Sequence, residues 1–480
     1  MKRLTLLSLS ALALAACSGS PLVAPDNALS SEPLARRSSK DRISIYVTNW
    51  DDDGHGSFRW AIEQANADPT IAEIVFTKNV QPVNLESTVT FSGTQALTID
   101  GQDAIIDGTD AGGSALVADG GASLKIKDLT VQNAPGEGIA VEIPLTATGT
   151  IKVTLERVTI MDNAGHGVLV NDQVDPETVD GVQPNAAGSA ASLEVEVIES
   201  HILGNGYSVS DRDGVRVNEG GAGSLSFVSR ETTSEDNAAD GIELDERGDG
   251  NVVIDVSDTH ILRNGKFDPL DFDDGFDIDE YDAGSIIGSL VRSEAIDNYE
   301  EGLDFNENNA GDLRVDLSEV TANGNDEEGI DYEEDDDFAG GGDLVTKMVD
   351  IIANGNRGDG GLKIREKGLG SLVANVSGVQ ASGNTVSGIA VREDDLGSLS
   401  STIINAETRA NAAHGIDFDE NSDGDLTATV SNSVSSGNTL FGVRADEAGA
   451  GSGTLHLIPV DLTGNTGGTT TGNVVPTITP

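Results

Sequence analysis

The stretch GLDFNE at residues 302–307 is one copy of a motif that occurs nine times between Gly214 and Glu447. Each copy reads Gly, apolar, any residue, mostly apolar, any residue, Glu; the copies are GVRVNE, GIELDE, GFDIDE, GLDFNE, GIDYEE, GLKIRE, GIAVRE, GIDFDE and GVRADE. Six of the eight spacings between motif glycines are 27 residues, and the other two are 34 and 32. A fixed period of this size indicates stacked units, none of which buries its apolar face alone.

Within each repeat unit, apolar and polar residues alternate as they do in short β-strands. In the quoted copy, Leu303 and Phe305 alternate with Asp304 and Asn306, and a second alternation follows over residues 313–317. Two or three short strands and three turns therefore make one coil of 27 residues. Parallel coils stack about 4.8 Å apart, so about 14 coils would form a rod roughly 65 Å long. The sequence predicts an all-β parallel solenoid.

An asparagine precedes the motif glycine by four residues in many units. We interpret this column as an internal ladder, because Asn tolerates left-handed backbone and its amide can bond to the next coil. Its predicted members are structural and not catalytic: Asn163, Asn237, Asn298, Asn325, Asn384, Asn411 and Asn438.

The N-terminal part of the repeat region has a different pattern. Ser57 is placed to cap a short helix whose apolar face would hold Phe58, Ala61, Ile62 and Ala65 at helical spacing. The segment VTNWDDDGHGSFRWAIEQANA, residues 47–67, resembles the N-terminal signature of secreted right-handed parallel β-helix proteins, through the matching residues Gly56, Ser57, Arg59, Ala61, Ile62, Ala65 and Asn66. The resemblance spans about residues 43–465 and implies a pectate-lyase-like, right-handed parallel β-helix with a capping helix. It specifies fold and says little about function.

The first residues read as an export signal. Lys2 and Arg3 precede an apolar run that ends at Ala16, before Cys17, the only cysteine of the chain. This resembles a bacterial lipoprotein box, which implies cleavage before Cys17 and lipidation of its thiol. Ser18 follows where an aspartate would resemble an inner-membrane retention signal. We therefore expect an outer-membrane lipoprotein of the bacterial cell envelope, exposed at the surface or facing the periplasm, with its lipid as the only membrane contact.

These patterns divide the chain into five expected parts: a signal peptide at 1–16, a flexible tether at 17–41, an N-terminal cap with the first coils at 42–128, the β-helix repeats at 129–465, and a low-complexity tail at 466–480.

The charge balance limits the kinds of partner that the chain is expected to bind. The formal net charge is −54, from 82 acidic and 28 basic residues. Nucleic acid is excluded as an expected partner, because phosphate binding needs a basic surface. Cations, a surface polysaccharide or another surface protein fit better.

Acidic residues concentrate on four consecutive motif copies. Alternation places positions two and four after the motif glycine on the outside, with the motif glutamate at the strand end. The expected metal ligands are Glu243, Asp245, Glu246, Asp277, Asp279, Glu280, Asp304, Glu307, Asp331, Glu333 and Glu334, with Asp273 and Asp274 on an inserted turn. A weaker loop, Asp419, Asn421 and Asp423, resembles half of an EF-hand.

Three interpretations of these acids stay open. Unit charges 4.8 Å apart repel by roughly 0.9 kcal/mol in water and about 3.5 kcal/mol at an effective dielectric constant of 20, so something must screen them. Calcium binding is one answer, because hard cations take several carboxylate oxygens. A saline habitat is the second. The third is local: each strand-end glutamate accepts backbone N–H groups in its turn.

Basic residues follow the acids in the same columns. Lys363, Arg365 and Arg392 could serve as the base of a calcium-dependent polysaccharide lyase or epimerase acting on uronic-acid polymers, or they could compensate charge. Tryptophan occurs only at Trp50 and Trp60, and exposed aromatic residues for stacking on sugars are scarce. We therefore expect a non-catalytic, lipid-anchored scaffold or adhesin with a calcium-binding acidic face, and keep the lyase or epimerase as the alternative.

Overall fold

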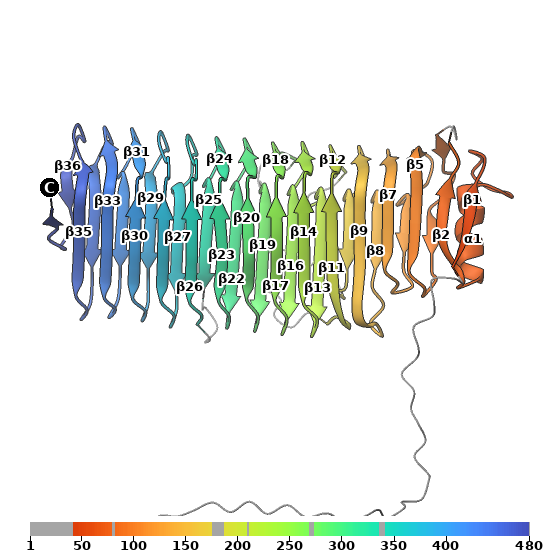
Figure 1. The fold of residues 1–480 in the computed structure, drawn as a ribbon, viewed down its shortest axis with the longest axis horizontal. Coiled ribbons are helices and arrows are strands. Elements are labelled where there is room, and N and C mark those ends of the chain that lie inside the picture. Colours follow the sequence, from red (N-terminus) through yellow and green to blue (C-terminus); the bar gives the residue numbers. More distant parts are fainter. Residues whose placement is uncertain are drawn as a thin grey trace, which may run out of the picture. The chain divides into compact units, whose positions relative to one another are not determined.

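The computed structural model describes residues 42–78, 82–174, 187–208, 211–267, 273–335 and 341–479. Cys17 and the expected signal peptide and tether lie outside these residues. The predicted fold class is confirmed: the described chain is an all-β parallel β-helix of about 15 turns with one short helix near its N-terminus (Figure 1).

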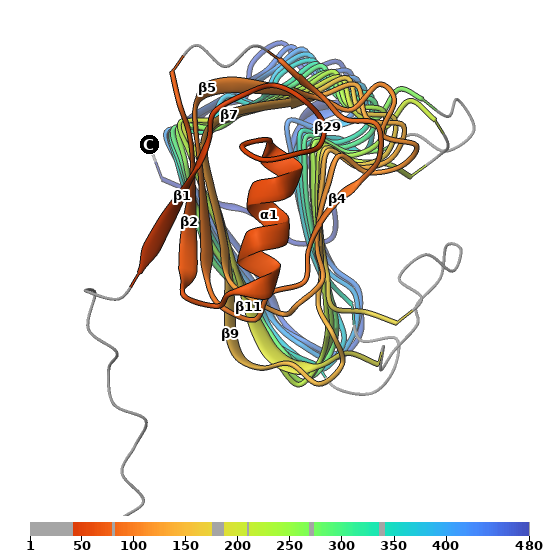
Figure 2. The same ribbon diagram turned by 90° about the vertical axis from the view of Figure 1, so that its right-hand side faces the viewer.

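Two parallel sheets form the walls of the solenoid (Figures 1 and 2). Sheet A contains β1 (Ile43–Val47), β2 (Ile71–Phe76), β3 (Val83–Asn84), β5 (Leu97–Asp107), β7 (Leu124–Gln132), β9 (Thr148–Met161), β11 (Ala190–Ile198), β12 (His201–Leu203), β14 (Leu225–Arg230), β15 (Thr233–Glu235), β17 (Val252–Ser257), β18 (His260–Leu262), β20 (Ile286–Val291), β21 (Glu294–Ile296), β23 (Leu313–Ser318), β24 (Thr321–Asn323), β26 (Leu344–Val349), β28 (Leu372–Ser377), β30 (Leu399–Ile404), β31 (Glu407–Arg409), β33 (Leu426–Ser436), β35 (Gly453–Asp461) and β37 (Thr477–Ile478).

Sheet B carries the repeated motif. It contains β4 (Val89–Phe91), β6 (Leu116–Ala118), β8 (Ile139–Glu142), β10 (Val168–Asn171), β13 (Val215–Gly221), β16 (Ile242–Gly248), β19 (Phe276–Asp282), β22 (Leu303–Asn309), β25 (Ile330–Asp335), β27 (Gly360–Lys367), β29 (Ser387–Glu393), β32 (Ile416–Glu420), β34 (Phe441–Glu447) and β36 (Gly468–Thr471). Each strand pairs with the equivalent strand of the next coil, so one motif position forms one continuous column.

The helix α1 (Phe58–Ala67) lies across the N-terminal end, between β1 and β2 on one side and β4 on the other (Figure 2). Its buried residues are the four predicted ones, Phe58, Ala61, Ile62 and Ala65. The N-cap is also confirmed, because the Ser57 hydroxyl accepts a hydrogen bond from the Trp60 N–H at 3.2 Å. The helix therefore covers the apolar interior of the first coil.

The core of the motif coils is a stack of apolar side chains. Leu303 and Phe305 are at most 1% exposed, as alternation predicts. The Phe305 ring centroid lies 6.3 Å from that of Phe276 and 4.7 Å from that of Tyr332 on the neighbouring coils. Burial of these columns holds coil to coil, since no single coil has a core of its own.

The asparagine ladder is confirmed and is longer than predicted. Asn298 donates from both its backbone N–H and its side-chain amide to the Asn325 Oδ1, at 3.0 and 3.1 Å. The same arrangement adds four members that the four-residue spacing missed, because inserted or altered turns separate them from the glycine: Asn205, Asn264, Asn356 and Asn465.

The motif glutamates form a second internal column, so the expectation that they stand beside the outward acids is wrong. Glu246, Glu280, Glu307 and Glu334 are 0% exposed. The fifth position after the glycine shares the parity of the first and third, so it points inward. The third interpretation holds for several members: the Gly250 N–H donates to Glu246 at 3.3 Å, and equivalent bonds reach Glu334, Glu366, Glu393 and Glu420.

The C-terminal residues extend the coil pattern past the expected boundary. The segment predicted as a tail, 466–480, contains β36, which pairs with β34, and β37, which pairs with β35. A strand needs only backbone pairing, so the Thr-rich composition does not prevent it. Within the described residues, no helix has the length and apolar character needed to cross a membrane.

Candidate functional site

The outward acids of sheet B gather on four adjacent strands, as predicted. The strand register places Glu243, Asp277, Asp304 and Asp331 in one column. A parallel column holds Asp245, Asp279, Asn306 and Glu333. We call this surface of β16, β19, β22 and β25, together with the acids that precede these strands, the acidic face.

The acidic face is recessed. Asp245 is 0%, Asp331 4% and Glu243 7% exposed, although all three point away from the core. On sheet A, the outward residue Val253 is 41% exposed. The acids therefore lie in a covered surface, where the effective dielectric constant is lower than at an open one.

A third acidic column lies beside these two, and Asp274 is its only member that the sequence pattern predicted. The residue directly before the motif glycine is acidic on five consecutive coils and lies beside the acidic face: Asp213, Asp240, Asp274, Glu301 and Glu328. Each aspartate binds the next coil, because the Asp274 N–H donates to Asp240 at 2.5 Å and the Glu301 N–H donates to Asp274 at 2.7 Å. The signal was present in the sequence as a repeated acid one residue before the glycine.

Two of these columns meet at Asp277. Asp240, Glu243 and Asp277 each offer a carboxylate oxygen, and these oxygens lie within 4.8 Å of one another. Asp274, Asp277 and Asp304 form a second such group. The two groups share Asp277, so five carboxylates form one cluster, which we call the Asp277 cluster. Further groups of three flank it: Asp211, Asp213 and Glu243; Asp274, Glu300 and Glu301; Glu301, Glu327 and Glu328.

Cations close the acidic face at both ends. Arg216 is 4% exposed and contacts Glu243 at 2.5 Å and Asp245 at 3.2 Å. At the other end, Lys363 contacts Asp331 at 2.5 Å and Glu333 at 3.2 Å. Among the described residues no ion pair reaches Asp240, Asp274, Asp277 or Asp304. The centre of the face therefore holds carboxylates without a basic partner.

The electrostatics of the Asp277 cluster follow from burial and crowding. Burial first, and neighbouring carboxylates second, raise the pKa of Asp277 and of Asp304 well above the ordinary range. The Oδ1 atoms of both residues are buried without a hydrogen-bond donor. An all-oxygen donor set with orphaned oxygens fits a hard divalent cation. The acidic clusters could thus hold a metal ion.

Some predicted ligands are occupied by other partners. Asp245 binds Arg216 and Arg247, at 3.2 and 3.0 Å. The Tyr281 hydroxyl donates to Asp279 at 2.7 Å. Asp273 does belong near the cluster, since its charge is one cause of the raised pKa of Asp240.

The predicted half EF-hand does not converge. Asp419 pairs with Arg444 at 2.9 Å. The Asn421 amide donates to Asp394 at 2.5 Å, while Asp423 accepts the Ala450 N–H at 3.0 Å. The three side chains therefore bind separate partners along the coil edge.

The three basic candidates are held in ion pairs. Burial lowers the pKa of Lys363, but the carboxylates of Asp331 and Glu333 outweigh burial and raise this pKa above its ordinary value. Arg365 contacts Asp394 at 2.5 Å and Glu333 at 3.1 Å, and Arg392 lies 3.7 Å from Asp359. Lys363 is therefore charged at neutral pH and is a poor base.

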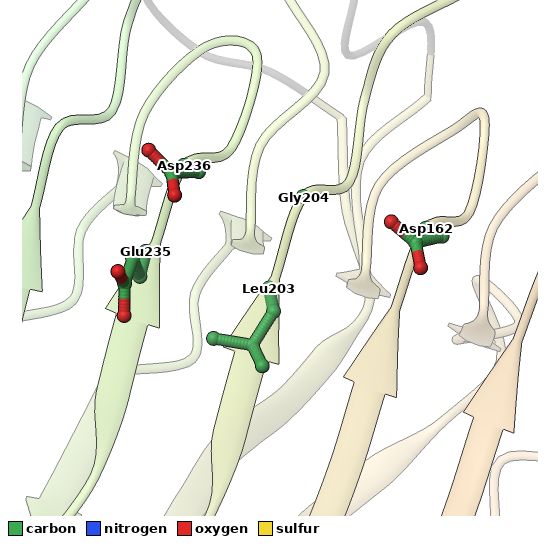
Figure 3. A pocket seen from close by; sticks show the side chains of 5 residues that line it. All are labelled: Asp162, Leu203, Gly204, Glu235 and Asp236. Carbon is green, nitrogen blue, oxygen red and sulfur yellow. The ribbon is translucent and has the colours of Figure 1, made fainter.

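A separate shallow recess of about 320 Å³ lies at the turns of the asparagine ladder, lined by Asp162, Leu203, Gly204, Glu235 and Asp236 (Figure 3). Glu235 and Asp236, on the coil of β15, bind Arg263. It is not part of the acidic face.

Comparison with known proteins gives only distant structural matches. No protein-family model and no curated protein matches the chain. A periplasmic alginate epimerase matches at 12% identity and a TM-score of 0.29, covering 68% of this chain and 77% of the epimerase. The catalytic domain of a GH87 α-1,3-glucanase, solved with tetrasaccharides, matches at 12% identity and a TM-score of 0.34, covering 94% of this chain and 70% of the glucanase.

The expectation of a non-catalytic scaffold or adhesin is corrected, because both solved structures carry the names of enzymes that act on carbohydrate. At 12% identity and TM-scores below 0.5, these matches do not define the reaction of this chain.

Proposed function

We propose that the chain is a divalent-cation-dependent enzyme that acts on uronic-acid polymers, as a lyase or an epimerase, with the acidic face as its active site. The observation that carries this proposal is the Asp277 cluster: five recessed carboxylates, of which all but Glu243 have no basic partner among the described residues, on a face closed by a basic side chain at each end. Perturbed titratable groups gathered in this way are typical of functional sites.

Calcium is the cation that this cluster fits best. It takes six to eight oxygens in flexible geometry, and the cluster offers carboxylate oxygens only. The residues that would hold it are Asp240, Glu243, Asp274, Asp277 and Asp304. A bound cation also explains how an acidic face could bind an anionic polymer, because it would neutralise the cluster and attract the uronate carboxylate.

The reaction needs a proton acceptor from the chain. Lyases and epimerases of uronates both begin by removing the proton from the carbon next to the carboxylate, and the bound cation would make that proton more acidic. Burial and nearby carboxylates raise the pKa of Glu301 to about 8 and of Glu328 to about 7. A carboxylate in this range is a stronger base than an ordinary glutamate and is still ionised in part at neutral pH.

Lys363 has a different role in this scheme. Its ammonium group lies beside Asp331, next to the Glu328 column, and its charge is one of the groups acting on Glu328. It would stabilise the anion that forms when the proton leaves. In elimination, the bond from the neighbouring carbon to the glycosidic oxygen then breaks; in epimerisation, a proton returns to the opposite face.

Glycoside hydrolysis is the second candidate. The specific observation that favours it is the raised pKa of several face carboxylates, including about 6 for both Asp279 and Asp331. A protonated carboxyl can donate to a glycosidic oxygen while an ionised neighbour activates water.

An assay of purified protein separates these candidates. Alginate, polygalacturonate and a neutral α-glucan would be incubated with calcium or with a chelator. Ultraviolet absorbance detects unsaturated uronates, proton NMR detects inverted uronates, and a reducing-end assay detects hydrolysis. We expect uronate chemistry that the chelator abolishes and that Asp277→Asn lowers by about 100-fold or more.

Asp316→Asn, on the exposed outer face of sheet A, is the matched control and should keep full activity. Reducing ends from the neutral glucan, unaffected by chelator, would favour the hydrolase. Absence of any product would contradict an enzymatic role.

We also propose that Cys17 carries lipid and anchors the enzyme in a bacterial cell envelope. The observation behind this is the apolar run that ends at the only cysteine. Metabolic labelling with a clickable fatty acid tests it: the wild type should be labelled and Cys17→Ala should not. Labelling that persists in Cys17→Ala would contradict the proposal.

A further inference from the structure

The internal glutamate column is the largest set of buried ionisable groups outside the acidic face. Strand register aligns nine motif glutamates from Glu219 to Glu447 on consecutive coils. In the C-terminal half, Glu366, Glu393 and Glu420 are 0% exposed and lie on strands that carry no residue of the Asp277 cluster. The column is therefore a separate feature of the molecule.

Each of these three carboxyl groups has one satisfied oxygen. The Oε1 atom accepts the backbone N–H four residues ahead, from Gly370 at 3.1 Å to Glu366 and from Gly397 at 3.0 Å to Glu393. The Oε2 atoms of all three are buried without a donor from the described residues. A buried oxygen without a donor costs about 1–3 kcal/mol, and more if it is charged.

Among the described residues, no basic side chain faces the column at these coils. Along it, Glu366 lies between Glu334 on β25 and Glu393 on β29, and Glu420 on β32 follows. The other groups that face it are backbone N–H groups of the following turn, including that of Asp395.

The neighbouring basic side chains turn outward. Lys367 pairs with Asp335 and Arg365 with Glu333 and Asp394, while Arg392 lies nearest to Asp359. Among the described residues, Glu366, Glu393 and Glu420 therefore have no counter-charge.

We propose that adjacent glutamates of this column share protons, so that a neutral carboxyl on one coil donates to the carboxylate of the next and the stack acts as a pH-sensitive clasp between coils. The direct stacking of Glu366 on Glu393 carries the proposal, because the donor that each Oε2 lacks is the proton that its neighbour would supply. Charge-assisted O–H···O⁻ bonds are among the strongest in proteins.

The titration behaviour agrees with this geometry. Burial first, and Glu334 on the preceding coil, raise the pKa of Glu366 to about 8, although the hydrogen bond with Glu393 lowers it. Burial first, and the interaction with Glu366 second, raise the pKa of Glu393 to about 9. The folded state thus binds protons that the unfolded chain releases near pH 4.5. Stability from the clasp is complete below about pH 4.5 and is lost as the pH rises through about 8 and 9.

Glutamine variants of the full chain test the clasp. The side-chain amide of Glu393→Gln can donate permanently to Glu366 and its oxygen can still accept the Gly397 N–H. We expect the wild-type melting temperature to fall between about pH 6 and pH 10, and the fall to be smaller in Glu366→Gln and Glu393→Gln. Glu407→Gln, an exposed glutamate on β31, should melt with the same pH profile as the wild type.

Infrared spectroscopy gives an independent readout at neutral pH. The band of protonated carboxyl groups should be present in the wild type and weaker in the double variant Glu366→Gln/Glu393→Gln. The proposal would be overturned if the glutamine variants melt below the wild type at both ends of the range from about pH 6 to pH 10. It would also be overturned if their melting temperature falls with pH as steeply as that of the wild type. So would a chelator that lowers the melting temperature of the wild type but not of the double variant, since the column would then hold a cation.

Discussion

The outer faces of the two sheets are built from the same coils but treat charge in opposite ways. On β17 of sheet A, Val253 and Asp255 are exposed, and Asp255 pairs with the exposed Arg230. On β16 of sheet B, the outward residues Glu243 and Asp245 are buried. Charges on sheet A are solvated and paired, whereas the centre of the acidic face is recessed and unpaired.

This difference shows that the fold does not require the recessed carboxylates of the acidic face. Sheet A shows that a coil of this solenoid can present ordinary polar residues outward and remain stable. Recessed carboxylates without counter-charges cost free energy through desolvation and repulsion. Consecutive coils that carry this cost at the centre of the acidic face are the argument for the proposal that a cation binds there.

Removal of the Lys363 ammonium group, which closes one end of the acidic face, should have the largest effect on stability. Lys363→Met leaves Asp331 without its ion-pair partner, while Glu333 keeps Arg365 and Lys367, and loss of one member of a buried pair typically costs about 3–5 kcal/mol. Chemical denaturation at neutral pH would measure the change in unfolding free energy. On sheet A, Arg314→Met breaks the exposed pair with Asp312 and should cost less than about 1 kcal/mol. Equal costs for the two variants would mean that the faces do not differ.

Calcium should stabilise the protein by an intermediate amount. At a calcium concentration 100 times the Kd, linkage adds about 2.7 kcal/mol to the folded state. Thermal melting with calcium and with chelator would detect it, and the shift should vanish in Asp277→Asn/Asp304→Asn. A shift that survives in this double variant would place the cation elsewhere.

The smallest expected change in unfolding free energy comes from replacing one acid of the Asp277 cluster when no metal ion is bound. Asp277→Asn removes one of several crowded carboxylates, so in chelator it should raise the unfolding free energy by about 1 kcal/mol. Because the pKa of Asp277 is raised, the gain should grow as the pH rises and the carboxyl ionises. Asp255→Asn on sheet A loses only an exposed ion pair and should change stability little at any pH. Destabilisation by Asp277→Asn in chelator would show that the acids serve the fold.

Local patterns in the sequence predicted the coil, the capping helix and the asparagine ladder. These features depend on residue periodicity, and Phe58 to Ala65 and Asn298 to Asn325 behave as periodicity requires. The outward columns Glu243 to Asp331 follow from the same alternation.

The rest of the site depends on which coils lie side by side and on how deeply a face is covered. Asp240 and Asp274 precede the strands, and their approach to Asp277 requires the register of neighbouring coils. The ion pairs of Asp245 with Arg216 and Arg247 depend on side-chain direction in three dimensions. The glutamate column was misplaced for a simpler reason: its odd position in the motif was read as a strand end and not as an inward site.

Equilibrium binding of calcium, followed by isothermal titration calorimetry, tests the central claim that the unpaired carboxylates of the acidic face serve a ligand. The account predicts saturable binding to the wild type and to the sheet A control Asp316→Asn, and loss of that binding in Asp277→Asn/Asp304→Asn. Failure of the wild type to bind calcium, or undiminished binding by the double variant, would contradict it.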